Sequence, residues 1–172
     1  MPTTLYYSSI KTTWGICGFV VSGKTLLRFY LPFPNKTLLK QAVQDDFGDV
    51  SYQGGLWPKL QKGVLQYFNG HISSYLTTLL LNTDHQTQFT QDVTNALMRV
   101  TVGSTVTYGE LADLAGYTGA ARGVGSVMRR NVFPLLVPCH RVVPASGKGV
   151  GQFSALGGEV LKEKLLAHEA SF

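Results

Sequence analysis

The chain has 172 residues, of which 44% are hydrophobic and 15% charged, the composition of a globular protein and not of a disordered one. It carries 15 basic and 10 acidic residues, and its two cysteines, Cys17 and Cys139, exclude a disulfide framework and favour a reducing intracellular compartment. No signal-peptide pattern and no run of about 18 apolar residues is present, so we expect neither a secretion signal nor a membrane span.

The first eighty residues predict a small domain of strands followed by helices. Segments rich in aromatic and β-branched residues predict three strands, at 4–10, 14–21 and 25–31. Helical patterns follow at 36–46 and 57–68. The polar, nonperiodic stretch 82–88 predicts a linker, so we expect an N-terminal domain at 1–85 and a C-terminal domain at 86–172.

The pattern beyond this linker is helical. It predicts an amphipathic helix at 89–100, a loop at 103–108 and two short helices at 109–115 and 120–130. Gly116 is expected to end the helix at 109–115. Two short helices across a glycine-containing turn predict a helix-turn-helix, a motif that reads DNA.

The helix at 120–130 has two different faces. Val124, Val127 and Met128 form an apolar stripe, which predicts the buried face. The opposite face presents Arg122, Ser126 and Arg129, with Gly123 and Gly125 beside them. Glycines weaken a helix by up to ~1 kcal/mol each relative to alanine. Two explanations stay open for them: close approach to a sugar-phosphate backbone, or tight packing against another helix.

The positive charge is concentrated in one segment. Residues 114–158 contain five basic residues and no acidic one, while the rest of the chain is balanced. The five are Arg122, Arg129, Arg130, Arg141 and Lys148. This excess predicts a polyanionic partner, with a merely solvated basic surface as the alternative.

The segment Pro138-Cys139-His140-Arg141-Val142 places a thiol next to an imidazole and a guanidinium. Adjacent cations lower the pKa of a thiol from its free value of about 8.5, and histidine can take up the proton. The alternative is an inert cysteine on a buried strand. Because histidine and arginine are costly to bury unpaired, their presence favours a reactive Cys139.

The last helix carries a carboxylate on its apolar face. Leu161, Leu165 and Leu166 define that face, and Glu169 falls in the middle of it. A buried carboxylate near a helix C-terminus needs a partner, and we expect His140. Lys162 lies close to the same phase, so a structural Lys–Glu pair is the alternative.

Pro-Cys-His-Arg-Val-Val at 138–143 resembles the active-site signature of the O6-alkylguanine-DNA alkyltransferases. The resemblance extends from residue 89 to residue 169, about half of the chain. It runs through the motifs at 103–112, 120–125, 128–131 and 162–169. The first eighty residues match in general character only.

This resemblance implies an α/β (α+β) protein, with a small ribonuclease-H-like N-terminal domain and an all-helical, winged helix-turn-helix-like C-terminal domain. It implies direct-reversal DNA repair by a single-turnover methyltransferase. The alkyl group of O6-alkylguanine, and of O4-alkylthymine, passes irreversibly to Cys139 after the base has been flipped out. It further implies a monomer that binds double-stranded DNA in the minor groove, without cofactor or metal, in the cytoplasm or on the nucleoid.

The resemblance also assigns roles to individual residues. Cys139 is the nucleophile, His140 the base that acts through a water, and Glu169 the acid that orients His140. Asn131 ties the DNA-reading helix to the active-site segment. The expected DNA and base contacts are Tyr108 beside the flipped nucleotide, Arg122 in its vacated place, and Ala121, Gly123, Gly125, Ser126, Arg129, Arg141, Phe153 and Ser154.

One loop departs from the family pattern. The family has Gly-x-Tyr-Ser-Gly-Gly, whereas this chain has Phe153 without the hydroxyl and an apparent insertion of Ala155-Leu156. The width of the pocket, and the preference for methyl over bulkier groups, therefore stay open.

Two other functional classes were weighed. A lesion-binding protein like the alkyltransferase-like proteins would lack the cysteine, and a cysteine hydrolase would need an oxyanion-hole motif. Cys17, His71 and His85 lack the spacing of metal ligands.

Overall fold

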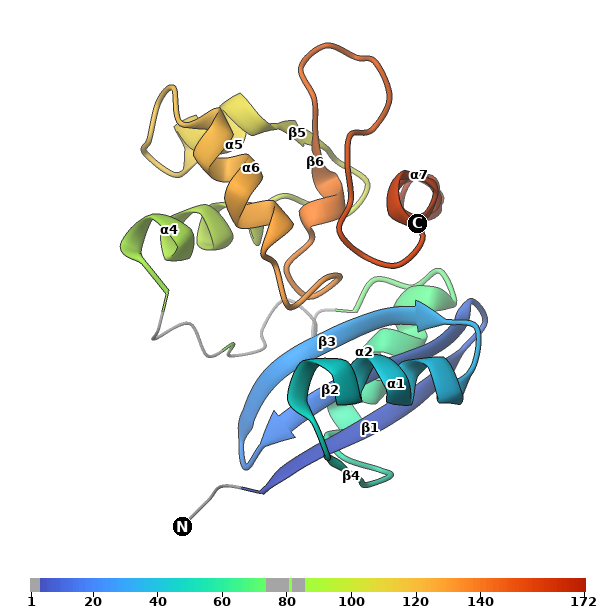
Figure 1. The fold of residues 1–172 in the computed structure, drawn as a ribbon. Helices are drawn as coiled ribbons and strands as arrows, with labels where there is room; N and C mark the ends of the chain where they lie inside the picture. Colours follow the sequence, from blue (N-terminus) through green and yellow to red (C-terminus); the bar gives the residue numbers. More distant parts are fainter. Residues whose placement is uncertain (1–3, 74–80, 82–85) are drawn as a thin grey trace. The chain divides into compact units, whose positions relative to one another are not determined.

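The computed structural model describes residues 4–73, 81 and 86–172 (Figure 1). The chain is a mixed α/β protein that divides into two compact units, Met1–Asn82 and Thr83–Phe172. The predicted linker at 82–88 falls largely outside the described residues, and its last residue, Gln88, already belongs to a helix.

The first unit is built on a four-stranded sheet of order β3-β2-β1-β4. β1 (Leu5–Thr12), β2 (Gly15–Ser22) and β3 (Thr25–Phe33) pair antiparallel, which confirms the three predicted strands with bounds within two residues of those predicted. β4 (Ser51–Tyr52) adds a short parallel edge next to β1. β4 was not predicted, because two residues are too few to show the alternation of a strand.

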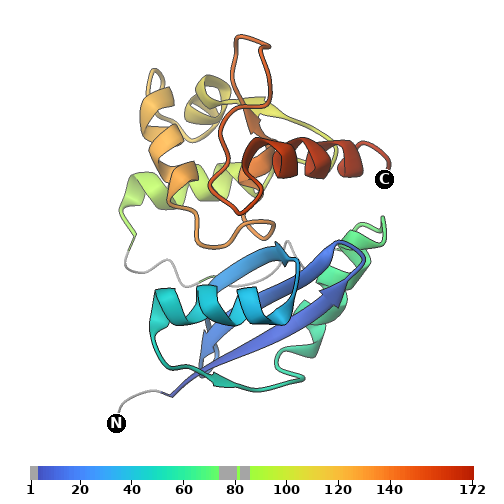
Figure 2. The same ribbon diagram turned by 45° about the vertical axis from the view of Figure 1, so that its right-hand side comes forward.

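Helices cover both faces of this sheet (Figures 1 and 2). α1 (Lys36–Phe47) packs on β2 and β3 so closely that a Cβ on Gly18 would lie 2.6 Å from Leu39. α2 (Pro58–Phe68) packs against β1. Phe19, which follows Gly18 in β2, points to the other face of the sheet, where its ring centroid lies 6.4 Å from that of Trp57. The core on the α1 face consists of Tyr7, Val20, Tyr30, Leu39, Val43 and Val50.

The second unit contains four α-helices within the described residues and a two-stranded sheet (Figure 2). The helices are α4 (Gln88–Leu97), α5 (Tyr108–Leu114), α6 (Ala121–Arg129) and α7 (Gly158–Glu169). The sheet pairs β5 (Val106–Thr107) in parallel with β6 (Val142–Val143), so part of the predicted loop at 103–108 is strand. This pairing brings the start of α5 beside the segment that carries Cys139.

The start of α5 is fixed by local chemistry. The Thr107 hydroxyl accepts the backbone N–H of Glu110, while the Glu110 carboxylate accepts the N–H of Thr107, a complete capping box. After Gly116, the N–H of Tyr117 returns to the carbonyl of Ala112 at 2.8 Å and closes the helix end. Tyr108, the first residue of α5, is thereby held in a defined place.

The glycines of α6 differ in what surrounds them. A Cβ on Gly123 would lie 2.9 Å from the ring of Phe89 on α4, whereas a Cβ on Gly125 would lie 4.0 Å from Tyr108. Tight helix packing, the second of the two explanations left open, therefore accounts for Gly123. Gly125 instead faces the region of the candidate site.

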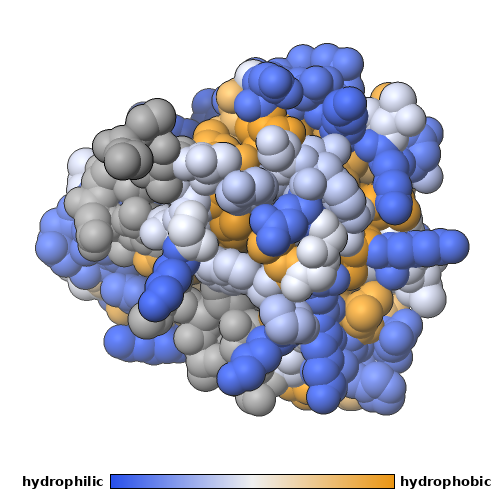
Figure 3. All heavy atoms as spheres, turned by 90° about the horizontal axis from the view of Figure 1, so that it is seen from below, coloured by the Kyte–Doolittle hydropathy of each residue, from blue (hydrophilic) through white to orange (hydrophobic). Residues whose placement is uncertain are grey.

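Apolar side chains on the surface are scattered over both units, from Leu38 and Tyr52 to Leu114 and Val160. The face in Figure 3 is mostly hydrophilic, with apolar atoms in small patches. Among the described residues, no helix has the length and apolar character needed to cross a membrane.

Candidate active site

Cys139 opens a short 3-10 turn, Cys139–Arg141, which leads directly into β6. The N–H of Arg141 bonds to the carbonyl of Pro138 at 2.9 Å, and the N–H of Val142 bonds to the carbonyl of Cys139. The apolar run before it is largely buried, and Cys139 itself is only 4% exposed. The cysteine thus sits in a tight turn and not on a strand.

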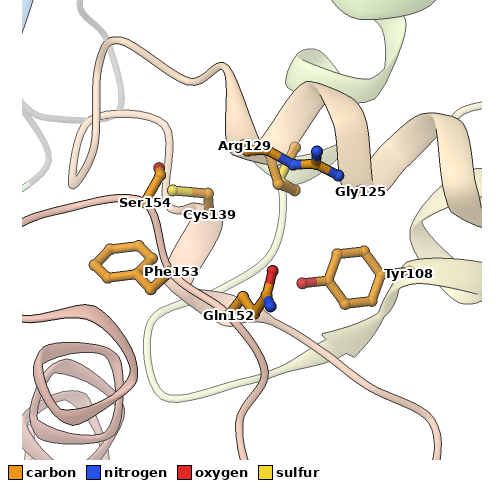
Figure 4. Close-up of a pocket in the computed structure, with 8 residues that line it drawn as sticks. Tyr108, Gly125, Arg129, Cys139, Gln152, Phe153 and Ser154 are labelled. Carbon is orange, nitrogen blue, oxygen red and sulfur yellow. The ribbon is translucent and has the colours of Figure 1, made fainter.

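Cys139 lines a cavity of about 190 Å³ between α5, α6 and the loop after β6 (Figure 4). This volume is below the ~300–1,000 Å³ typical of sites for drug-sized ligands, so it suits one small group. In Figure 4 the Gln152 amide and the Tyr108 hydroxyl point toward one another. The lining contains six predicted residues, Tyr108, Gly125, Arg129, Cys139, Phe153 and Ser154, and two that were not predicted there, Met128 and Gln152.

Asn131 holds the thiol from the end of α6. Its Nδ2 donates to Cys139 Sγ at 3.0 Å and to the carbonyl of Val137 at 2.9 Å, and its Oδ1 accepts the N–H of Phe133 at 2.9 Å. One amide therefore joins α6 to both ends of the segment before the cysteine.

The thiol is not activated in the way that its sequence neighbours suggested. Burial raises the pKa of Cys139, and the hydrogen bond from Asn131 and the charge of Lys162 offset this only in part. The side chains of His140 and Arg141 both contact Glu169 instead, and within the described residues no side-chain hydrogen bond joins Cys139 Sγ to the His140 ring. Of these two residues, only the backbone N–H of His140 favours the thiolate. The expectation that these adjacent cations lower the pKa of the thiol is therefore wrong.

Glu169 is the centre of a buried polar cluster. Its Oε1 accepts from His140 Nε2 at 2.7 Å and from Arg141 Nη2 at 2.9 Å. Its Oε2 accepts from Arg141 Nε at 2.8 Å and from the N–H of Gly103 at 3.2 Å. The partnership with His140 that the helical phase of Glu169 predicts is present, and Arg141 is an additional partner.

The cluster fixes the protonation of His140. Burial alone would raise the pKa of Glu169, but the hydrogen bonds from His140 and Arg141 and the charge of Arg141 hold it well below its usual range. Burial also lowers the pKa of His140, against the opposing effect of Glu169. An ionised carboxylate only accepts hydrogen bonds, so the Nε2 of the neutral ring carries the proton. Nδ1 is then a free base, and it is buried without a hydrogen-bond partner among the described residues.

Arg141 does not lie where the sequence predicted it. Its side chain is buried, and Nη1 donates to the carbonyl of Val100 at 2.7 Å while the rest of the guanidinium binds Glu169. A DNA contact is therefore ruled out for this side chain in the structure, and its charge is compensated by Glu169. The exposed basic side chains of residues 114–158 are the remaining four, Arg122, Arg129, Arg130 and Lys148.

The other predicted contacts lie on α6 outside the cavity lining. Arg122 is exposed, and Ala121 and Ser126 are half-buried. Tyr108 lines the cavity, and burial, followed by the charge of Cys139, raises its pKa. Within residues 4–73, 81 and 86–172, no cluster of three or more metal-binding side chains is close enough to hold an ion.

Sequence reasoning placed Lys162 near the inward face of the last helix but missed its partner. This residue is buried, and its Nζ donates to the carbonyl of Val142 at 2.6 Å, directly after the cysteine turn. Among the described residues no ion pair joins Lys162 to Glu169, so the alternative of a structural Lys–Glu pair is wrong. The available signal was its helical phase, which it shares with Leu165 and Glu169.

Comparison with known proteins places this site in a family. Residues 88–171 match the model of the 6-O-methylguanine DNA methyltransferase DNA-binding domain. A methylated-DNA–protein-cysteine methyltransferase of Mus musculus is 51% identical over 85 residues, which cover 49% of this chain and 39% of the mouse protein. The chain thus aligns with about two fifths of that relative.

Solved structures extend the likeness to both units. The crystal structure of Mycobacterium tuberculosis O6-methylguanine methyltransferase has a TM-score of 0.76 and 30% identity, covering 98% of this chain and 94% of that one. The same mycobacterial protein in complex with DNA has a TM-score of 0.76 and 30% identity, covering 96% and 93%. The chain belongs to the O6-methylguanine DNA methyltransferase family.

Proposed function

We propose that this protein repairs DNA by moving the alkyl group of O6-alkylguanine, and of O4-alkylthymine, onto Cys139 Sγ. The observation that carries the proposal is the thiol at the wall of a cavity of about 190 Å³, held by Asn131 and backed by the His140–Glu169 pair. A cavity of this size accepts one base with a small substituent. The family relatives named above support the assignment.

The chemistry needs a thiolate and a proton for the departing base. His140 Nδ1, as a neutral base, takes the proton of Cys139 through one water molecule, while Glu169 stabilises the imidazolium that forms. The sulfur then attacks the alkyl carbon, an S–C bond forms, and the C–O6 bond breaks with its electrons on the guanine. Return of the proton to the guanine restores unmodified guanine in the DNA. The thioether that remains is a poor leaving group, so each protein reacts once.

Delivery of the base is assigned to α5 and α6. We propose that these helices form the helix-turn-helix that enters the minor groove, with Arg122 filling the space of the flipped nucleotide. The exposed basic side chains of residues 114–158 would neutralise phosphates. The DNA complex of the mycobacterial relative supports DNA as the partner. Tyr108, with Gly125 beside its ring, would contact the flipped nucleotide within the cavity.

The finer fold description and the setting of the reaction belong to the same proposal. The order of strands and helices in Met1–Asn82 supports a ribonuclease-H-like domain, and the second unit a winged helix-turn-helix type. We propose that the protein acts as a monomer, without cofactor, where the DNA is: in the cytoplasm or on the nucleoid.

The proposal is tested by stoichiometry. A limiting amount of protein is mixed with increasing amounts of duplex DNA that contains O6-methylguanine, and the repaired guanine is counted. The repaired guanine should reach a plateau at one per protein. Continued product formation beyond this ratio would indicate turnover by a hydrolase and would overturn the proposal.

A further inference from the structure

Lys162 is a buried ammonium group to which the reaction above gives no role. It is 1% exposed and lies on the inward face of α7, seven residues before Glu169. Its Nζ donates to the carbonyl of Val142 at 2.6 Å. Because the N–H of Val142 bonds to the carbonyl of Cys139, the ammonium is fixed to the end of the turn that carries the thiol.

The charge of Lys162 has no carboxylate partner within hydrogen-bonding reach among the described residues. Glu169, two turns further along α7, is occupied by His140 and Arg141. Glu159, one turn before it, is exposed and interacts through its charge alone. Burial of an unpaired charge is unfavourable, so this lysine reduces stability unless an anion forms beside it.

The anion that can form in this enclosure is the thiolate of Cys139. Lys162 and Cys139 interact electrostatically, and each favours the charged form of the other. We propose that Lys162 is a positioning residue whose positive charge stabilises the Cys139 thiolate. This inference rests on the proposed function, because it concerns the same nucleophile. It gives Lys162 the part that sequence proximity had suggested for His140 and Arg141.

The surrounding charged groups leave this part to Lys162, because Arg129, which lines the same cavity, is exposed to solvent and does not shift the pKa of Cys139. His140, in the same turn, is held neutral by burial, and Tyr108, from α5, keeps its proton because burial raises its pKa. Burial lowers the pKa of Lys162, but the negative charges of Cys139 and Glu159 oppose that effect. When Cys139 ionises, the ammonium gains its counter-charge, and when Cys139 is alkylated it loses that counter-charge again.

The test measures the ionisation of Cys139 without using DNA. The rate of iodoacetamide modification is followed against pH, and the Cys139 peptide is quantified by mass spectrometry so that Cys17 does not contribute. Lys162→Met keeps the apolar stem without charge or donor, and Lys162→Gln keeps a donor for Val142 without charge. Lys164→Met removes an exposed cation of the same helix and controls for net charge.

Both Lys162 variants should move the pH profile of Cys139 upward by about one unit, which corresponds to an order of tenfold slower modification at neutral pH. Lys164→Met should leave the profile unchanged. The melting temperature of the Lys162 variants should be equal to that of the wild type or higher, because a buried charge has been removed.

Three results would overturn the inference. A wild-type profile in Lys162→Gln would reduce the lysine to a hydrogen-bond donor. An equal loss of rate at every pH, or a variant that fails to fold, would show a structural role. Repair of duplex DNA that contains O6-methylguanine is measured in parallel. A wild type that does not repair this DNA, while the profiles shift as predicted, would contradict the proposed function and leave the role of Lys162 standing.

Discussion

Replacement of Glu169 by glutamine should destabilise the second unit and slow the reaction by separate routes. In the wild type the carboxylate neutralises Arg141, and both side chains are buried. Glu169→Gln leaves the guanidinium without a counter-charge and turns an amide N–H₂ toward groups that are themselves donors. Breaking a buried pair in this way costs about 3–5 kcal/mol, a large share of the ~5–15 kcal/mol that stabilises a domain.

The double variant Glu169→Gln/Arg141→Met separates the two effects. Removing the orphaned cation should restore most of the lost stability, since replacing a whole buried pair is often neutral. It should not restore the reaction, because His140 still lacks the acid that orients it. We expect single-turnover reaction with free O6-benzylguanine to stay about 10²-fold slower or more, the usual share of general-base catalysis.

The assay must report on the second unit. Trp14 and Trp57 both lie in the first unit, so tryptophan fluorescence is uninformative. Urea unfolding followed by circular dichroism, with hydrogen exchange of the α7 amides, measures the relevant free energy. A stability loss below about 1 kcal/mol in Glu169→Gln would refute the reasoning, as that is far below the range for a broken buried pair. A double variant as unstable as the single one would refute it equally.

The effect of Glu169→Gln on stability should depend on pH. The folded pKa of Glu169 lies below its unfolded value of about 4.3, so its contribution is complete above that pH and is lost as the pH falls through the folded pKa. Glu169→Gln should remove this part of the acid-induced loss. The pKa of His140 is lowered as well, so its contribution is complete above about 6.5 and declines below it.

Three further predictions concern DNA and packing. Arg122→Ala should weaken repair of duplex DNA far more than reaction with O6-benzylguanine, because a free base needs no flipping, and an equal loss on both substrates would make Arg122 structural. DNA affinity should fall as salt concentration rises. On a double-logarithmic plot the slope should be no steeper than about −3.6, the value for phosphate contacts by all four exposed basic side chains of residues 114–158. A salt-independent affinity would contradict the predicted phosphate contacts. Gly123→Ala should lower thermal stability, because its Cβ meets Phe89 at 2.9 Å and overpacking costs about 1–3 kcal/mol, whereas Gly125→Ala should gain up to ~1 kcal/mol of helix propensity; a reversed order in calorimetry would show that Phe89 moves aside freely.

Local patterns predicted most of the elements of the fold. The three long strands and α1, α2, α5 and α6 follow from periodicity and from turn residues, with ends that differ by a residue or two. The β5–β6 pair could not be predicted in this way. Val106 and Val142 are 36 positions apart, and two residues on each side carry no alternation. α4 ends three residues early because its last turn closes with shorter-range bonds, such as Arg99 N–H to the carbonyl of Ala96.

The sequence predicted which residues belong to the site better than it predicted where their side chains point. Helical phase placed Glu169 inward, because a regular helix fixes direction. In the turn at Cys139 no such periodicity exists, so adjacency in sequence could not tell that Arg141 faces away from the surface. The pKa of the thiol depends on burial, which is set by the whole unit. The contribution of Lys162 depends on the packing of α7 against the cysteine turn, a contact between distant segments.

The identity of the alkyl acceptor is the central claim, and one measurement tests it directly. The protein is incubated with duplex DNA that contains O6-methylguanine with a trideuterated methyl group, digested, and examined by mass spectrometry. The peptide with Cys139 should gain one trideuterated methyl group in place of one hydrogen, the peptide with Cys17 should be unchanged, and Cys139→Ser should gain nothing while still binding DNA. Label on any other residue, or repair by Cys139→Ser, would contradict the account.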